Sequence, residues 1–312
     1  MNNHIENLPP PPPHKTGWPW TVESEKLLES DSSQAYPKIS IITPSYNQGE
    51  FLEETIRSVL LQNYPNREYI IMDGGSTDNT VDIIKKYEQQ ITFWVSEKDN
   101  GQSHAINKGF ERSTGEMGMW LCSDDILCEN ALNNFVEHHF KGADKIYIGK
   151  GYQIDINSNI TKEIPLSKID TIEKLLDITS YWRSKKKRDS ILQQSVLYPI
   201  EIFRKVGGLS INYYYTMDYE LWCKLFIYGL KVVRCNTDIG MFRWYKGQKT
   251  SFEYKATKEL VAVAKKLLKV SPIDETEKQK IKYNINKYWL LFRYSQFRSW
   301  LGVMRRIKRI FN

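Results

Sequence analysis

The sequence has few of the residues that build covalent or metal cross-links. Among its 312 residues there are four cysteines and five histidines, and no two cysteines form a CxxC pair. No histidine pair at metal-ligand spacing stands beside them, so the pattern argues against a structural zinc site. We expect four reduced and mostly buried thiols, as in a cytosolic protein.

Signals for export or membrane insertion are also missing. The first twenty residues, MNNHIENLPPPPPHKTGWPW, contain no basic segment followed by an apolar core, and no run of 18 apolar residues occurs. The sequence therefore predicts neither a secretory signal nor an ordinary transmembrane helix. We expect the protein in the cytoplasm.

Two common phosphate-binding motifs are absent as well. There is no GxxxxGK[ST] loop, and no GxGxxG follows a strand-like segment. These absences argue against a P-loop enzyme and against a dinucleotide-binding protein. A nucleotide ligand would have to be bound in another way.

The net charge of +7 comes from the C-terminal tail. Residues 281–312 contain eight Lys or Arg and no acid, which leaves 36 basic residues against 37 acidic ones elsewhere. A basic amphipathic helix with aromatic residues is typical of a membrane-surface element. The alternative is a helix packed on the body with solvated basic residues, and no groove-binding motif supports a nucleic-acid partner. Apolar tail residues recur at the helical spacings 3, 4, 3 and 4: Phe297, Trp300, Met304, Ile307 and Phe311.

The chain divides into three regions by its pattern. Residues 1–36 form a proline-rich arm, in which Trp18 and Trp20 follow five consecutive prolines and could dock the arm on the body. From residue 37 to 251, apolar β-branched runs alternate with amphipathic stretches. Residues 252–312 form the basic, amphipathic helical extension.

Strands and helices alternate at short intervals in the first half of the body. This order means right-handed crossovers and an α/β fold, with a Rossmann-like, mostly parallel central sheet flanked by helices. We expect strands at residues 38–43, 68–73, 91–96 and 117–122, and helices at 50–62, 80–87 and 103–112. Later we expect a helix at 129–140, a hairpin turn at 157–159 and a helix beginning near Asp218.

Polar residues follow each of the four expected strands. Because ligands bind outside the carboxyl ends of parallel strands, these residues should gather along one edge. The adjacent carboxylates of Asp124 and Asp125 would repel each other unless a cation neutralised them, which predicts Mg²⁺ or Mn²⁺ and a diphosphate substrate. A helix N-cap beside an exposed aspartate would explain the pair equally well. The segments are TPSYN (43–47), DGGSTD (73–78), EKDNGQSH (97–104) and SDD (123–125).

Four segments, in this order, resemble the family 2 glycosyltransferases, whose fold is called GT-A: TPSYNQGEFLEETIRSVLLQ, IIMDGGSTDNT, DNGQSHAINKGF and WLCSDDIL. The likeness covers about residues 37–251, with a donor half at about 37–128 and an acceptor half at about 129–251. It implies a metal-dependent enzyme of the hexosyltransferase type that uses a nucleotide sugar, with a UDP-sugar as the first expectation.

The resemblance implies roles on the donor side. Asp73 would contact the base, Thr43 and Tyr46 would line the nucleotide pocket, and Gln102 would contact the nucleotide sugar.

The SDD segment resembles the family's metal motif, which is DXD in its fuller form. By that match Asp125 would ligate the cation, and Asp124 would hold the ribose or a metal-bound water. Ser123 stands where the motif has its first acid.

The segment GGLSINYYYTMDYELWCKL (207–225) resembles the family's segment that carries the catalytic base. Asp218 matches the base and Glu220 a following acid. From the residues alone, Asp218 would also serve as a helix N-cap. Gln194, in the QQS segment, resembles a residue that lines the acceptor side.

The segment FRWYKGQKTS (242–251) resembles a family segment that usually has histidine where this chain has Tyr245. Arg243 and Lys249 could neutralise phosphate charge there. The family implies inverting transfer to a glycan or lipid-linked acceptor in surface polysaccharide or lipopolysaccharide synthesis, at the cytoplasmic membrane face. The alternative is a catalytically inactive nucleotide-sugar-binding or scaffold protein, marked by Ser123 and Tyr245.

Overall fold

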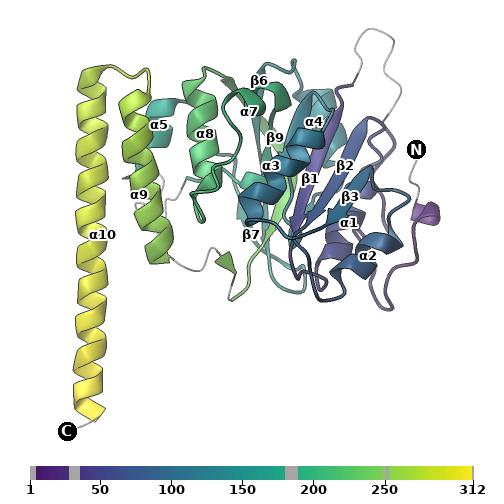
Figure 1. The fold of residues 1–312 in the computed structure, drawn as a ribbon, viewed down its shortest axis with the longest axis horizontal. Coiled ribbons are helices and arrows are strands. Elements are labelled where there is room, and N and C mark those ends of the chain that lie inside the picture. Colours follow the sequence, from purple (N-terminus) through teal and green to yellow (C-terminus); the bar gives the residue numbers. More distant parts are fainter. Residues whose placement is uncertain (1–4, 28–35, 180–188, 247, 250–252, 311–312) are drawn as a thin grey trace.

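The structure is a computed structural model that describes residues 5–27, 36–179, 189–246, 248–249 and 253–310, and for 253 and 299–310 it describes the backbone alone. Figure 1 shows strands and helices alternating along the chain. The strands are β1 (Ile39–Ser45), β2 (Arg67–Asp73), β3 (Phe93–Ser96), β4 (Met117–Trp120), β5 (Ile126–Leu127), β6 (Lys145–Ile154), β7 (Ile160–Ile164), β8 (Val196–Pro199) and β9 (Lys231–Arg243). The helices are α1 (Leu52–Leu60), α2 (Thr80–Lys86), α3 (Gln102–Arg112), α4 (Ala131–His138), α5 (Ile172–Leu176), α7 (Ile200–Lys205), α8 (Met217–Ile227), α9 (Glu253–Val270) and α10 (Glu275–Ile310).

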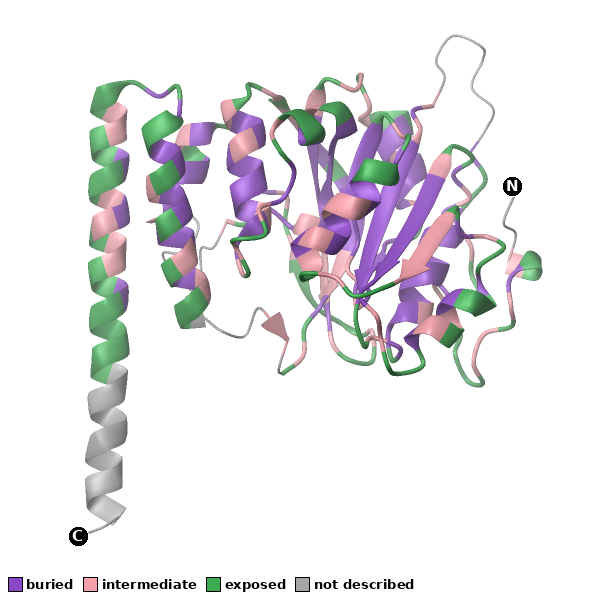
Figure 2. Cartoon of the chain, viewed as in Figure 1, coloured by how far each residue is buried: buried purple, intermediate pink, exposed green. Residues whose placement is uncertain are grey.

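The first four strands form the parallel half of the sheet, in the order β3-β2-β1-β4. Successive residues of β1 face opposite sides: Ile41 packs in a core with α1 and α4, and Ile42 in a core with α3 and α8. A strand that is buried on both faces needs an unbroken apolar run. The expected elements of this half are confirmed, with ends within two residues of those observed. Figure 2 shows the buried strands between partly exposed helices.

The second half of the sheet continues in the order β8-β6-β9-β5, and β7 pairs with β6. β8 is antiparallel to both β4 and β6, whereas β6 and β9 are parallel. The β6–β7 hairpin confirms the turn expected at residues 157–159. The last strand, β9, pairs with β5, which directly follows the two aspartates. This pairing brings residues that are more than a hundred positions apart to the candidate site.

The N-terminal arm is docked on α1 and on the β5 segment. The guanidinium of Arg57 is fully buried and donates to the carbonyl oxygens of Pro19 and Trp20 at 3.0 and 2.7 Å. The Trp18 indole donates to the carbonyl of Leu127 at 2.8 Å. Both tryptophans that were expected to dock the arm therefore lie against the body.

Two long helices end the chain, and α10 runs past the rest of the body (Figure 1). Ile281 and Ile285 are buried at its start. The helix predicted from the tail's periodicity is confirmed, although the side chains of Trp300, Met304, Ile307 and Phe311 lie outside the described part. Within the described residues, none of the helices is long and apolar enough to cross a bilayer. Apolar side chains are exposed farther along α10: Leu290, Leu291, Tyr294 and Phe297.

Candidate active site

Asp73 ends β2 and fixes the turn that follows it. Its Oδ1 accepts a hydrogen bond from the Ser76 hydroxyl at 2.5 Å. Its Oδ2 accepts from the Ser96 hydroxyl at 2.5 Å and from the N–H groups of Gly75 and Ser76 at 3.1 and 2.9 Å. The carboxylate thus holds the DGGSTD turn against β3, and its contact with a base stays a prediction.

Tyr46, Gly74 and Asp99 share one surface at the ends of the first three strands. A methyl group at Gly74 would lie 2.7 Å from an Asp99 carboxylate oxygen and 3.4 Å from the Tyr46 ring, so a larger residue there would displace the Asp99 side chain. Tyr46 is 61% exposed. An exposed ring can stack on a nucleotide base, and a carboxylate beside the ring can accept hydrogen bonds from the N–H groups of that base. Asp99 was not predicted as a site residue, although its place after the third strand was the available signal.

Thr43 does not reach this surface. Its side chain is fully buried on the face of β1 that carries Ile39 and Ile41, and its hydroxyl lies 3.2 Å from the Tyr69 hydroxyl. The expectation that Thr43 lines the nucleotide pocket is therefore corrected, because its hydroxyl points into the core beneath α1.

The two adjacent aspartates differ in accessibility. Asp125 is only 1% exposed; its Oδ1 accepts from the Arg243 backbone N–H at 2.8 Å, and its Oδ2 accepts from the Gln194 amide. Asp124 is half-buried, and the Tyr245 hydroxyl donates to its Oδ2 at 3.1 Å. Burial raises the pKa of both carboxyls, and the neighbouring Asp124 charge raises the pKa of Asp125 further. Asp124 is therefore the carboxylate that a ligand can approach.

The donor atoms around this pair suit a divalent cation. The Cys122 sulfur and one carboxylate oxygen each from Asp124 and Asp125 lie within 4.8 Å of one another. Two like charges in a buried setting favour a cation between them, and carboxylate oxygens are ligands that Mg²⁺ and Mn²⁺ prefer. The residues present thus fit such an ion. Cys122 was expected only as one of four buried thiols; the turn closed by the Asp125 N–H on the Cys122 carbonyl at 3.0 Å, which the sequence did not reveal, places it beside the aspartates.

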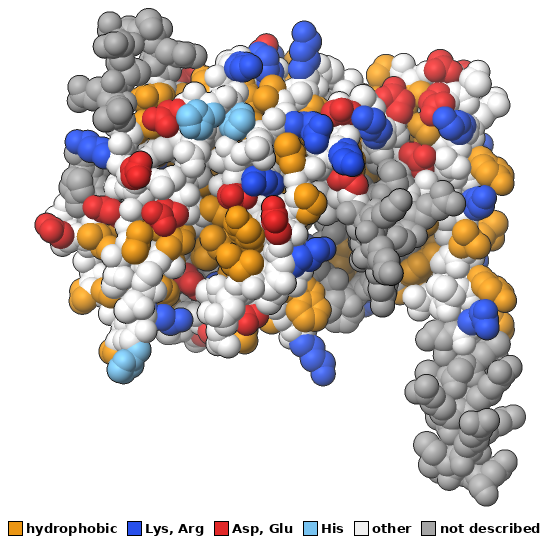
Figure 3. Space-filling view, turned by 180° about the vertical axis from the view of Figure 1, so that it is seen from behind, with side chains coloured by type: hydrophobic (Ala, Val, Ile, Leu, Met, Phe, Trp, Pro, Cys, Tyr) orange, Lys and Arg blue, Asp and Glu red, His pale blue; other side chains and the backbone are white. Residues whose placement is uncertain are grey.

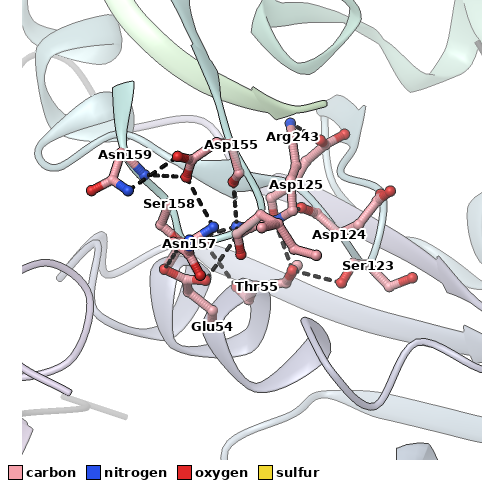
Figure 4. Close-up of polar contacts among 12 residues, drawn as sticks. Glu54, Thr55, Ser123, Asp124, Asp125, Asp155, Asn157, Ser158, Asn159 and Arg243 are labelled. Atoms are coloured by element: carbon pink, nitrogen blue, oxygen red, sulfur yellow. Dashed lines mark hydrogen bonds and ion pairs between the residues drawn. The ribbon is translucent and has the colours of Figure 1, made fainter. Parts of the chain in front are cut away.

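Arg243 ties the aspartate turn to its surroundings, and Figure 4 shows it beside Asp125. It is fully buried, pairs with Glu54 at 2.8 Å and donates through Nε to the carbonyl of Asp124 at 2.7 Å. It also donates to the Ser158 hydroxyl at 2.9 Å, and that hydroxyl donates to Glu54. The expectation that Arg243 neutralises phosphate is corrected, because every direction of its guanidinium faces the protein interior.

Replacing Arg243 by methionine should destabilise the fold by about 3–5 kcal/mol, because Glu54 would keep a buried charge without its partner. Reversible urea unfolding measures the loss. Lys205→Met, which removes an exposed pair with Glu201, should leave the unfolding midpoint unchanged. A loss below about 1 kcal/mol for Arg243→Met would contradict the role assigned to this network.

Asp218 lies in the first turn of α8, which begins at Met217 after the N-cap Thr216. The N-cap interpretation of Asp218 is therefore wrong. Its Oδ1 accepts from the Tyr219 N–H at 2.7 Å. Burial raises the pKa of its carboxyl, the hydrogen bond from Tyr219 and the charge of Lys249 oppose this, and the charge of Glu259 adds to it. A carboxylate with a raised pKa is a stronger base, as proton abstraction requires.

Lys249 brings a cation into the same region. Its ammonium donates to the Gln102 amide oxygen at 2.8 Å and lies 4.3 Å from the centre of the Tyr214 ring. Gln102 in turn donates to the Cys122 sulfur at 3.2 Å. Burial lowers the pKa of Lys249, while the nearby Cys122 and Asp218 raise it. The structure thus brings residues of α3, the β4 end, α8 and the segment after β9 together.

A model of glycosyl transferase family 2 matches residues 40–203, more than half of the chain. The chain belongs to this family. It is 29% identical over 192 residues to the poly-beta-1,6-N-acetyl-D-glucosamine synthase of Staphylococcus epidermidis, covering 61% of this chain and 45% of that protein. It is 31% to 33% identical to three uncharacterized glycosyltransferases of Rickettsia species, and the match spans only 31% to 59% of their length.

Solved glycosyltransferases share the fold. The S. aureus TarS fragment 1-349, in complex with UDP-GlcNAc, superimposes with a TM-score of 0.56 at 18% identity, over 78% of this chain and 70% of that one. The mannosyltransferase PcManGT of Pyrobaculum calidifontis, in complex with GDP-Man and Mn²⁺, gives 0.58 at 16% identity, over 80% and 69%. The α/β fold of GT-A type, with its curled, mostly parallel sheet and C-terminal helices, is confirmed.

The family 2 residues expected on the acceptor side are both buried. Gln194 serves Asp125, as described above. Glu220 is 2% exposed and pairs with Lys224 at 2.9 Å, and Lys224 donates to the carbonyl of Gly208 at 2.9 Å. Both side chains are held by partners within the protein, and a contact with an acceptor stays a prediction for each.

Proposed function

We propose that this family 2 glycosyltransferase moves a sugar from a nucleoside diphosphate, a UDP-sugar in the first instance, to a hydroxyl of a glycan or lipid-linked acceptor. The transfer inverts the anomeric carbon and serves surface polysaccharide or lipopolysaccharide synthesis. One observation carries the proposal: Lys249 donates to Gln102, Gln102 donates to the Cys122 sulfur beside the aspartate pair, and Lys249 feels the charge of Asp218. The relative that is a polysaccharide synthase supports the biological setting.

Asp218 is the proposed base. It accepts the proton of the acceptor hydroxyl while that oxygen attacks the anomeric carbon from the side opposite the nucleotide. The bond from the anomeric carbon to the diphosphate oxygen breaks, and the leaving diphosphate gains negative charge. Lys249, inside the site and tied to Gln102, offsets that charge.

The aspartate pair is the proposed cation site. Bound there, Mg²⁺ or Mn²⁺ would supply positive charge at the leaving diphosphate. Asp125 was the expected ligand; because its two oxygens already accept hydrogen bonds, we assign the leading contact to the accessible Asp124 and a supporting one to Asp125. The hydroxyl of Tyr245, held neutral by a pKa raised to about 12, orients Asp124 by donating to it.

The donor base is proposed to lie on Tyr46. The adjoining Asp99 carboxylate and the turn fixed by Asp73 would bound that base, and Gln102 would face the sugar and diphosphate. Tyr46→Ala would then weaken donor binding but leave Asp218, the proposed catalytic base, in place.

Thermal unfolding with a panel of UDP- and GDP-sugars tests the function directly. A donor at one hundred times its dissociation constant should stabilise the protein by about 2.7 kcal/mol, and EDTA should remove the effect. The same donors should be slowly hydrolysed in Mn²⁺, which an inactive binding protein would not do. Stabilisation without any turnover would favour the inactive alternative.

We further propose that α10 binds an anionic membrane surface. From residue 281 to 298 of α10, exposed apolar and basic side chains occur without an acidic one, whereas both signs of charge are mixed over the body (Figure 3). The protein should sediment with phosphatidylglycerol vesicles at low salt, and changing Lys287, Arg293 and Arg298 to Glu should reduce binding by at least about 100-fold, since each basic residue contributes about 1 kcal/mol. The same change at the exposed lysines 255, 258 and 269 of α9 is the control, and equal losses in both variants would contradict a specific role of α10.

A further inference from the structure

Glu259 of α9 holds three consecutive backbone N–H groups. Its Oε1 accepts from Tyr214 at 2.8 Å, and its Oε2 accepts from Tyr215 and Thr216 at 2.5 and 2.8 Å. The hydroxyl of Thr216 adds a fourth hydrogen bond at 3.0 Å. Successive N–H groups turned toward one point form a concave anion site, here filled by a side chain of the protein itself.

The segment that Glu259 holds leads directly into the proposed base. Thr216 is the N-cap position of α8, and Asp218 follows two residues later in its first turn. Tyr214 carries the ammonium of Lys249 over its ring at 4.3 Å. A shift of this segment would therefore move the carboxylate of Asp218 and the ammonium of Lys249 together.

Side-chain contacts hold the first part of this segment: Tyr213 packs against the core, and the ammonium of Lys266 lies 5.6 Å from the centre of its ring. The segment follows α7 through the sequence SINYYYT without regular secondary structure, and Ile211 and Tyr214 are exposed. The N–H groups of residues 214–216, in contrast, find their acceptor outside the segment. Helix α9 supplies it from beyond residue 203, where the match to the family model ends.

We propose that Glu259 is a positioning residue for the transfer reaction, so that α9 forms part of the active site and not only an appendage. By fixing residues 214–216 it sets the place of Asp218 relative to the anomeric carbon and the place of Lys249 relative to the leaving diphosphate. The inference rests on the proposed function, since it assumes that Asp218 is the base. Misplacing a catalytic group by about 1 Å can reduce a rate by about 100-fold.

The test uses hydrolysis of UDP-N-acetylglucosamine and GDP-mannose in Mn²⁺ by the full chain, which needs no acceptor. Glu259→Ala and Glu259→Gln should lower kcat by about 10- to 100-fold. The KM for the donor should stay within about twofold of wild type, because Tyr46 and Asp99, the residues proposed to bind the nucleotide base, are untouched. Glu259→Asp, which keeps the carboxylate, should recover part of kcat. Glu277→Gln, on a partly exposed acid of α10 that pairs with Lys280, is the control.

Amide hydrogen exchange gives a readout independent of activity. The amides of residues 214–216 should lose protection in Glu259→Ala and Glu259→Gln, while the amides of β1 keep theirs, which also shows that the variants are folded. Wild-type kcat in both variants, with Asp218→Asn inactive, would overturn the inference and leave the proposed function standing. Absence of hydrolysis of every UDP- and GDP-sugar of the panel by the wild type would overturn the proposed function and this inference with it.

Discussion

Asp218→Asn should abolish sugar transfer and leave donor binding intact. The amide keeps the size of the side chain and can still accept the Tyr219 N–H, so α8 should begin as before. It cannot accept the proton of the acceptor hydroxyl, and loss of a general base lowers kcat by about 10²- to 10⁴-fold. Radiolabelled transfer measures kcat, and titration calorimetry with UDP measures donor binding.

Glu201→Gln is the control for this variant, because Glu201 is an exposed acid that pairs only with Lys205 among the ion pairs of the described chain. Its kcat should equal that of the wild type. Wild-type turnover in Asp218→Asn would remove Asp218 from the mechanism, whereas loss of UDP binding would mean that the residue supports the donor site.

The pH dependence of kcat should also report the ionisation of Asp218. The base must be ionised to accept a proton, so activity falls as pH drops through the pKa of Asp218. Burial raises that pKa above the ordinary 3.8, with opposition from Tyr219 and Lys249 and a smaller contribution in the same direction from Glu259. The acid limb should therefore lie above pH 3.8 and move to lower pH in Glu259→Gln, which removes a negative charge. A limb at or below 3.8 would contradict the raised pKa.

The fold was predictable from the sequence to the extent that its signals are local. The apolar run ISII predicts the strand β1, which is buried on both faces. The amphipathic spacing of α1 and α3 predicts these two helices. The pairing of β9 with β6 and β5 depends on chain closure over many residues, and no local pattern encodes it. That pairing places Arg243 against the two aspartates. The sequence therefore did not reveal that its guanidinium is buried.

The site was predictable as a set of segments but not as a set of side-chain directions. The polar strand ends did converge, as parallel strands require. Which of two adjacent carboxylates turns inward depends on partners such as Gln194 and the Arg243 backbone, which lie far away in sequence. For Thr43 the signal was present: the period of two in β1 places it on the face of Ile39 and Ile41.

Asp124→Asn should make the protein more stable and much less active. In the folded state, burial raises the pKa of Asp124, with Tyr245 and Arg243 opposing, so its ionised form is disfavoured relative to the unfolded chain. Removing the charge should raise the free energy of unfolding by about 1 kcal/mol at neutral pH in EDTA. The sign follows from linkage: the gain is full above the raised pKa and disappears below the ordinary 3.8, where both states are protonated.

Activity should fall although stability rises, because the Asp124 charge that destabilises the protein in EDTA is the charge that binds the metal ion. With Mn²⁺ at one hundred times its dissociation constant, the wild type should gain about 2.7 kcal/mol and Asp124→Asn almost nothing. Transfer should fall by about 100-fold or more, the scale of losing one electrostatic contact to the leaving group. Asp170→Asn, on a partly exposed acid that pairs with Lys174, should change neither quantity. An Asp124→Asn protein that is less stable in EDTA, or as strongly stabilised by Mn²⁺ as the wild type, would show that this carboxylate supports the fold and that the cation is held elsewhere.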